Sequence, residues 1–170
     1  TAEKIINFYG EIHKLKVVNL RLSNIYGERA QMKHSKFGVV NWFVRLAIED
    51  GTIKVFGDGK ILRDFLYVDD CVDAILAAGG SEKAYGGTFN VGNDRHSSFL
   101  ELVTTIIEVA GSGKWEYAPF TKERAAQEPG DFYPDITKIT KTTGWKPNVP
   151  LEEGLLRTVE FYRTNKSMYW

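Results

Sequence analysis

Apolar side chains recur at the spacing of a helix in several parts of the chain. Near the start, Ile5, Phe8 and Ile12 follow this spacing and predict a helix over about residues 1–14. The same pattern predicts further helices over the ranges 40–50, 70–78, 99–110, 136–143 and 151–165. Asp69 is the expected N-cap of the helix over 70–78, and Ser97 or Ser98 is that of the helix over 99–110.

Short runs of β-branched and aromatic residues predict strands between these helices. The runs are the ranges 15–22, 53–56, 62–68, 88–92 and 115–118. Gly57 and Gly59 favour a tight turn, so we expect the strands on either side of them to form a hairpin. Residues 119–134 are rich in proline and predict an irregular loop. The mixture indicates an α/β fold without the complete strand–helix–strand series of a self-sufficient parallel sheet.

The composition is that of a globular protein, since 43% of the 170 residues are hydrophobic and 26% are charged. The 22 basic and 22 acidic side chains cancel, so we expect no general attraction to nucleic acid or to an anionic membrane. Cys71 is the single cysteine, which excludes a disulfide framework and favours a reducing, cytoplasmic location. His13, His34 and His96 do not have the spacing of metal ligands.

Polar side chains come directly after the first predicted strand, in the segment Ser23-Asn24-Ile25-Tyr26-Gly27. Ligands of open α/β sheets bind at the carboxyl ends of strands, where this segment would lie. Asn24 has donor and acceptor groups that suit a sugar hydroxyl or a phosphate oxygen. An ordinary turn containing an asparagine would have the same residues, so both interpretations stay open.

A second cluster of aromatic and charged residues spans residues 56–70. Phe56 could lie against the ring of a base, and the forked guanidinium of Arg63 matches the geometry of a diphosphate. In the alternative interpretation Phe56 is a core residue and Arg63 pairs with Asp64 or Asp69. These residues alone favour neither interpretation.

Dinucleotide-binding domains have a glycine-rich turn between a strand and a helix, where backbone N–H groups approach the pyrophosphate. Gly57 and Gly59 lie between two predicted strands instead. The sequence therefore predicts no cofactor-binding glycine loop within these residues.

The order of the segments resembles that of the extended short-chain dehydrogenases, the family of UDP-galactose 4-epimerase and dTDP-glucose 4,6-dehydratase. Residues 21–27 resemble the family's RxxNxYG segment, and residues 56–70 resemble its (Y/F)GDGxxxRDxxYVDD segment. Further similar segments occur in the family's order, at 88–92, 98–102, 135–138 and 144–147. The resemblance spans essentially the whole chain.

The resemblance implies the C-terminal, substrate-binding portion of such an enzyme, with the last part of a Rossmann-type sheet and a small mixed α/β domain. Residues 1–30 would be the tail of the Rossmann-type domain. Residues 31–170 would be mainly the substrate-binding domain, with short returns to the Rossmann part. The family's catalytic Tyr-x-x-x-Lys pair would lie upstream, with its lysine immediately before Thr1, so we expect no catalytic residue in the chain.

The implied ligand is a nucleotide-diphosphate sugar, and the implied chemistry of the intact protein is transient oxidation of a sugar hydroxyl by NAD or NADP. The first interpretation is an epimerase. A 4,6-dehydratase or a non-catalytic nucleotide-sugar-binding module stays open beside it. We expect the chain alone to be inactive and to bind no cofactor. The intact protein is expected to be a homodimer, with neither nucleic acid nor a membrane as partner.

The resemblance also assigns roles to single residues. Those implied to contact the nucleotide sugar are Asn24, Val39, Phe56, Arg63 and Asn90. Ser23 is the implied contact of the nicotinamide cofactor.

Glu128 departs from the family pattern, because relatives often have an arginine at this point. A carboxylate would repel a diphosphate unless it points elsewhere. We expect either Arg124 to compensate, or Glu128 to accept a hydrogen bond from a sugar hydroxyl or a cytosine-type amine.

Overall fold

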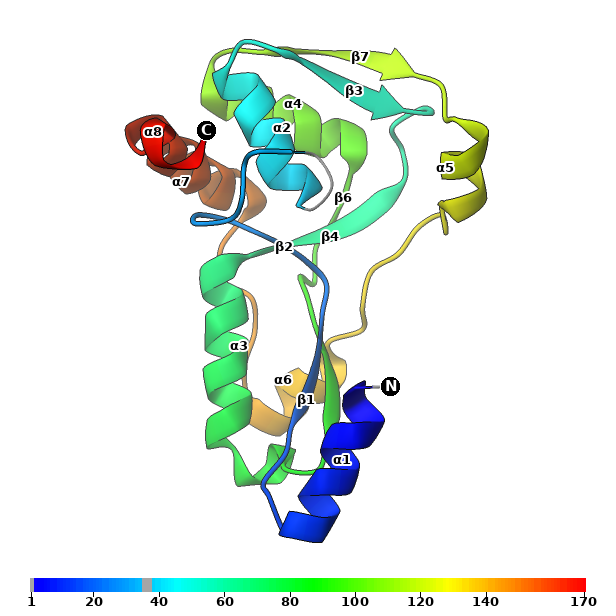
Figure 1. Ribbon diagram of the computed structural model, residues 1–170, viewed down its shortest axis with the longest axis vertical. Helices are drawn as coiled ribbons and strands as arrows, with labels where there is room; N and C mark the ends of the chain where they lie inside the picture. Colours follow the sequence, from blue (N-terminus) through cyan, green and yellow to red (C-terminus); the bar gives the residue numbers. More distant parts are fainter. Residues whose placement is uncertain (1, 35–37) are drawn as a thin grey trace.

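The computed structural model of the chain describes residues 2–34 and 38–170. Thr1 and residues 35–37, which belong to the predicted first helix and to the loop after the first strand, lie outside this part. The molecule is elongated, with an upper and a lower body joined by strands (Figure 1). Among the described residues, no helix has the length and apolar character needed to cross a membrane.

The upper body is built around helices that pack on a short pair of strands. Its elements are α2 (Val39–Ile48), β3 (Thr52–Phe56), β6 (His96–Ser98), α4 (Phe99–Ala110), β7 (Lys114–Ala118), α5 (Lys122–Gln127), α7 (Leu151–Thr164) and α8 (Lys166–Tyr169). The lower body contains α1 (Ala2–His13), β1 (Asn19–Leu22), α3 (Val68–Gly80), a 3₁₀ turn (Glu82–Ala84), β5 (Thr88–Val91) and α6 (Thr137–Thr143). The connecting strands are β2 (Asn24–Tyr26) and β4 (Leu62–Tyr67).

The strands form small sheets rather than one continuous sheet. β1 pairs with β5, β2 with β4, and β3 with β7, and all of these pairs are parallel. β6 adds to the other edge of β4 in the antiparallel direction. The mixed α/β character predicted from the sequence is confirmed.

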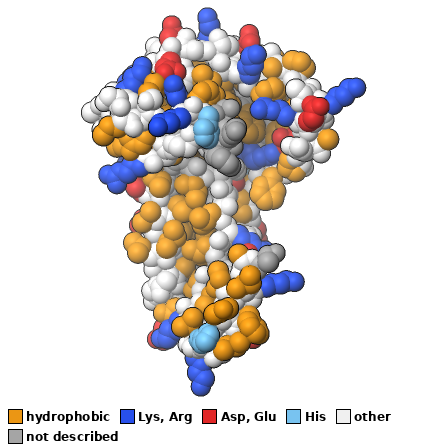
Figure 2. All heavy atoms as spheres, viewed as in Figure 1, with side chains coloured by type: hydrophobic (Ala, Val, Ile, Leu, Met, Phe, Trp, Pro, Cys, Tyr) orange, Lys and Arg blue, Asp and Glu red, His pale blue; other side chains and the backbone are white. Residues whose placement is uncertain are grey.

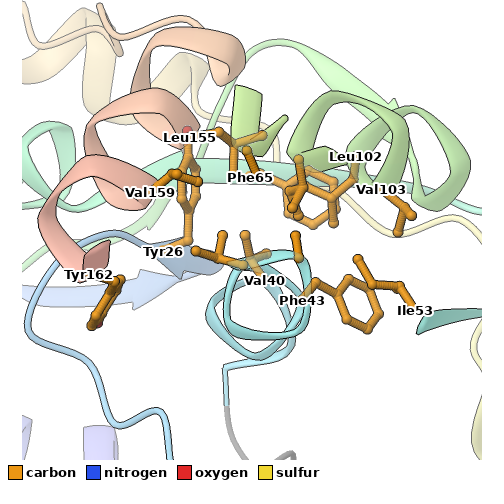
Figure 3. Packing of buried hydrophobic residues seen from close by; sticks show 14 of the residues in the cluster. Tyr26, Val40, Phe43, Ile53, Phe65, Leu102, Val103, Leu155, Val159 and Tyr162 are labelled. Atoms are coloured by element: carbon orange, nitrogen blue, oxygen red, sulfur yellow. The ribbon is translucent and has the colours of Figure 1, made fainter. Parts of the chain in front are cut away.

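Two clusters of buried side chains form the hydrophobic core. The upper cluster packs side chains from α2, α4 and α7 against Tyr26 and Phe65 (Figure 3). The lower cluster contains Leu66, Phe89 and Ile139. Each fully buried side chain of this size contributes about 1.5–3 kcal/mol relative to an exposed one. β4 serves both clusters, because Phe65 and Tyr67 belong to the upper one and Leu66 to the lower one.

The strongest helix predictions are confirmed. α4 begins after Ser98, whose hydroxyl accepts a hydrogen bond from the Glu101 N–H while the Glu101 carboxylate accepts one from the Ser98 N–H. This reciprocal pair is a capping box, which satisfies backbone donors that the first helical turn leaves free. Gly111 ends the helix in the left-handed conformation, with φ of 57°.

The predicted hairpin across Gly57 and Gly59 is wrong. Both glycines do have positive φ, as a tight turn requires, but β3 pairs with β7 and β4 pairs with β2 and β6. The turn therefore separates two sheets. β7 comes after α4, which returns the chain so that Lys114 lies beside Thr52 in parallel register.

Other boundaries also differ from the predictions. The first strand covers only Asn19–Leu22 and pairs with β5. The segment after it, which was predicted as a loop, contains the strand β2, and β2 pairs with β4. Tyr67, not Asp69, occupies the N-cap of α3. The predicted loop over 119–134 contains α5, because Thr121 accepts a hydrogen bond from the Arg124 N–H and caps that helix.

Asp70 ties the start of α3 to the segment between α6 and α7. Its carboxylate is buried and accepts hydrogen bonds from the N–H groups of Asn148 and Val149, each at 2.9 Å. The indole of Trp145 donates to the Asp70 carbonyl at 3.1 Å. A buried carboxylate with two N–H donors is satisfied, so this contact stabilises the junction of the two bodies.

Gly154 permits the close packing of α7 against β2 and β4. A Cβ at this position would overlap the Tyr26 hydroxyl and lie 2.9 Å from Cδ2 of Tyr67. We predict that Gly154→Ala lowers the free energy of unfolding by about 1–3 kcal/mol because of overpacking. Thermal melting would show a fall of roughly 2–4 °C for each kcal/mol.

Gly79→Ala is the matched control for this prediction. Gly79 also lies in a helix, but a Cβ there would meet no atom within 4 Å. Alanine is the better helix former, so this change should raise stability by up to about 1 kcal/mol. A similar change of melting temperature in both variants would contradict the packing described at Gly154.

Candidate functional site

A pocket of about 540 Å³ opens in the upper body. Its walls come from α2, β3, the start of α4 and the segment that contains α5. The lining residues are Val39, Trp42, Phe43, Leu46, Thr52, Lys54, Val55, Phe56, Gly59, Ile61, Phe99, Val103, Phe120, Arg124, Gln127 and Glu128. Most of these side chains are apolar or aromatic, and the volume falls in the range of small-molecule sites.

The aromatic rim of the pocket is positioned by the β3–β7 pair. Phe56 lies opposite Ala118 in this pair, so Phe120 comes to lie beside it shortly after β7 ends. The centroids of the Phe56 and Phe120 rings are 5.8 Å apart, and the rings are inclined by 31°. Gly57 is needed here, because its φ is 68° and a Cβ would lie 2.7 Å from the Phe120 ring.

Arg124 covers the ring of Phe56. Its guanidinium carbon lies 4.2 Å from the centroid of that ring, within the range of a cation–π contact. Arg124 and Lys54 are both exposed, and neither forms an ion pair with a described residue. The pocket thus combines aromatic walls with two cations that no described carboxylate neutralises.

Arg63 lies behind the pocket wall, next to Glu128. Its side chain is 10% exposed, and its Nη2 donates to Oε1 of Glu128 at 2.5 Å. Its Nη1 donates to the carbonyls of Leu62 and Gly130, and its guanidinium lies 5.8 Å from the centroid of Phe99. The alternative pairing with Asp64 or Asp69 is not found among the described residues, since Asp69 pairs with Arg157 and Asp64 bonds elsewhere.

A separate polar cluster lies where β1 and β5 end and β2 begins. The hydroxyl of Ser23 and the N–H of Asn93 both donate to Oδ2 of Asp64, which is fully buried. Oδ1 of Asp64 has no hydrogen-bond partner among the described residues. Gly92 makes this crowding possible, because a Cβ there would overlap the side chains of Asp64 and Pro134.

The structure brings together only some of the residues that the resemblance singles out. Val39 and Phe56 line the pocket. Asn24 and Asn90 do not line it; they lie in β2 and β5, near the polar cluster. The Asn90 amide donates to the carbonyl of Asp135 at 3.4 Å. The binding roles of all these residues stay predictions.

Several lining residues are not indicated by the sequence pattern. Trp42 reads as an ordinary member of an amphipathic helix, and Lys54 reads as an exposed strand residue. Phe120 lies in a segment predicted to be an irregular loop. The only signal was an aromatic residue soon after a strand, and this signal becomes specific only once β7 is known to pair with β3.

Two buried tyrosines in the core of the upper body, Tyr26 and Tyr67, are hydrogen-bond donors. Burial raises the pKa of Tyr67, and the Glu28 carboxylate that accepts its hydrogen bond raises it further. Burial also raises the pKa of Tyr26, whose hydroxyl donates to the Leu151 carbonyl at 3.2 Å. Both phenols therefore stay protonated at neutral pH and fix the core of the upper body.

The fold and the ordered sequence segments match one family. The model of the NAD dependent epimerase/dehydratase family matches residues 1–92. The UDP-glucose 4-epimerase of Mycolicibacterium smegmatis is 38% identical over 169 residues, which cover 98% of this chain and 51% of that protein. The chain belongs to the NAD-dependent epimerase/dehydratase family.

Other relatives agree with this assignment. The UDP-N-acetyl-alpha-D-glucosaminuronate decarboxylase of Bacillus cytotoxicus is 34% identical, over 96% of this chain and 51% of that protein. The solved UDP-glucose 4-epimerase of Thermotoga maritima, a complex with UDP-glucose, has a TM-score of 0.85 and 33% identity, covering 96% of this chain and 51% of that one. The chain spans about half the length of the relatives that it matches.

Proposed function

We propose that the pocket beside α2, β3 and α5 binds the nucleotide of a nucleotide-diphosphate sugar, and that the chain is part of an NAD(P)-dependent nucleotide-sugar epimerase. One observation carries this proposal: aromatic walls and two cations without a described ion-pair partner meet at the same pocket. A base is flat and can stack on an aromatic ring, while phosphates attract Lys54 and Arg124. A ligand with a base but no phosphate would not bind the two cations, and a ligand with phosphate alone would not contact the aromatic walls.

The relatives support this choice of ligand. The Thermotoga maritima enzyme, which is 33% identical to this chain, was solved with UDP-glucose. The identity of 38% to an epimerase, against 34% to a decarboxylase, favours the epimerase. A 4,6-dehydratase and a non-catalytic binding module remain the alternative predictions.

We further propose how the sugar would lie. β4 leads from the pocket wall to the polar cluster. Its residue Arg63 pairs with Glu128, which lines the pocket. The following residue, Asp64, accepts a hydrogen bond from Ser23. A nucleotide in the pocket would therefore point its diphosphate and sugar along β4. Asn24 and Asn90 lie at the far end of this path and have the groups to bind sugar hydroxyls.

In this proposal the chain supplies binding rather than chemistry. Residues 1–30 would belong with a Rossmann-type domain, and the catalytic tyrosine and lysine would come from outside these 170 residues. NAD or NADP would accept and return a hydride in the intact protein. Binding of the nucleotide would then position the sugar for that chemistry.

Among the described residues, the chain offers at most one contact to a nicotinamide cofactor, through Ser23. Ser23 uses its hydroxyl hydrogen for Asp64, so its oxygen could act only as an acceptor. The Gly57 and Gly59 turn lies between β3 and β4 and not before a helix, which is the wrong setting for a pyrophosphate. We therefore propose that this chain alone holds no NAD(P).

We also propose that the intact protein is a homodimer. α1 has no buried residue, and its large apolar side chains are exposed (Figure 2). These are Ile5, Ile6, Phe8, Tyr9 and Ile12. Such a contiguous apolar surface is typical of an interface.

We also propose a cytoplasmic location. The lone cysteine, Cys71, is buried and forms no disulfide, which fits a reducing compartment.

Titration calorimetry with UDP tests the pocket. We predict that the double variant Lys54→Gln/Arg124→Gln binds UDP at least about tenfold more weakly than the original chain, because charge-assisted hydrogen bonds to phosphate are lost. Binding of uncharged uridine should change little. The control is Lys83→Gln/Lys146→Gln, which removes the same charge from exposed positions outside the pocket. An equal loss in the control would contradict a specific phosphate site.

A turnover assay tests the division of labour. The chain supplied with NAD and UDP-glucose should form no UDP-galactose, because the proposed binding half has no catalytic pair. Product detected by chromatography above a blank without protein would show that the reaction is performed by residues of this chain.

A further inference from the structure

The Arg63–Glu128 pair is the most enclosed ion pair among the described residues. The Arg63 side chain is 10% exposed and that of Glu128 is 25% exposed. Glu128 lines the pocket and Arg63 does not. The carboxylate is therefore placed between the pocket and a buried guanidinium.

Arg63 has hydrogen-bond partners besides the Glu128 carboxylate. Its Nη1 donates to the Leu62 carbonyl at 2.9 Å and to the Gly130 carbonyl at 2.5 Å. Its backbone is fixed by β4, where it lies opposite Ser97. Only Nη2 is directed to the carboxylate, so a movement of Glu128 would leave the guanidinium in position with free donors.

The backbone that carries Glu128 is also fixed. The Leu62 N–H donates to the Asp131 carboxylate at 2.8 Å, and the Phe132 N–H donates to the Leu62 carbonyl at 3.1 Å. Within the described part of the chain, the Glu128 carboxylate accepts hydrogen bonds from Arg63 and from the Gly130 N–H, both on Oε1. Rotation of this side chain toward the pocket would therefore break few contacts.

Carboxylate and phosphate oxygens bind a guanidinium in the same way. We propose that Glu128 is an internal competitor that occupies the anion site of Arg63, and that a ligand diphosphate must displace it in order to bind there. This inference rests on the proposed nucleotide function of the pocket. Glu128 then sets how strongly the pocket discriminates between charged and uncharged ligands.

The geometry of the ion pair would be the same if the pair served only to hold residues 128–131 against β4. The two roles predict different effects of removing the carboxylate. If the role is only structural, the variant loses stability and gains no anion affinity. If Glu128 is a competitor, the variant loses stability in the absence of ligand but gains anion affinity, because the donors of Arg63 become free for the phosphate.

The test is titration calorimetry of Glu128→Gln with inorganic pyrophosphate, UDP and uridine. We expect pyrophosphate and UDP to bind about tenfold more tightly, or better, than to the original chain, with uridine unchanged. The matched control is Glu123→Gln, which removes a charge from the neighbouring helix α5 at an exposed position without contact to Arg63. Its pyrophosphate affinity should stay within about twofold of the original.

Thermal melting provides a second readout. Glu128→Gln should melt below the original chain without ligand and should be stabilised more than it by the same concentration of pyrophosphate. If Glu128→Gln does not fold, Glu128→Asp replaces it, because the shorter side chain retracts from Arg63 and should give a smaller gain in the same direction. No gain in pyrophosphate affinity, or an equal gain in Glu123→Gln, would overturn the proposal.

Failure of the nucleotide proposal would look different. Uridine would then bind to none of the variants, while the ranking of pyrophosphate affinities would still report on Arg63 and Glu128.

Discussion

β4 connects the two hydrophobic cores with the pocket wall and the polar cluster. It is the central strand of its sheet, and all of its residues except Leu62 are buried. Because side chains alternate along a strand, Phe65 and Tyr67 enter the upper core while Leu66 enters the lower one. The same alternation directs Arg63 toward the pocket wall and Asp64 toward Ser23. A shift of register by one residue would exchange these partners, so β4 fixes the two cores and both polar sites at once.

The two bodies differ in how completely they are covered. The upper body encloses its core with α2, α4 and α7, and it holds the pocket at its edge. In the lower body, α1 has no buried residue and displays its apolar side chains. The chain spans about half the length of its Mycolicibacterium smegmatis relative, and an exposed apolar face such as that of α1 is typical of an interface.

Sequence periodicity predicted the helices that have a clear apolar stripe and a cap, such as α4 with Ser98 and Gly111. It missed α5, which has no buried residue and depends on Thr121 for its start. The prediction of a β3–β4 hairpin was wrong because strand pairing here is decided by tertiary contacts rather than by the intervening turn.

Phe56 was predicted as a site residue, but its neighbours Phe120 and Arg124 lie in a different part of the sequence. The partner of Arg63, Glu128, is 65 residues away along the chain, so local patterns pointed to Asp64 and Asp69 instead.

In the proposed complex a nucleotide occupies the pocket and directs its phosphates toward β4. A crystal structure of the chain with UDP would show whether it does. We expect the base against the ring of Phe56, with Arg124 moved from that ring to the phosphates, and the phosphates near Lys54 and Arg63. Density for UDP at another site, or an empty pocket at saturating UDP, would contradict this claim.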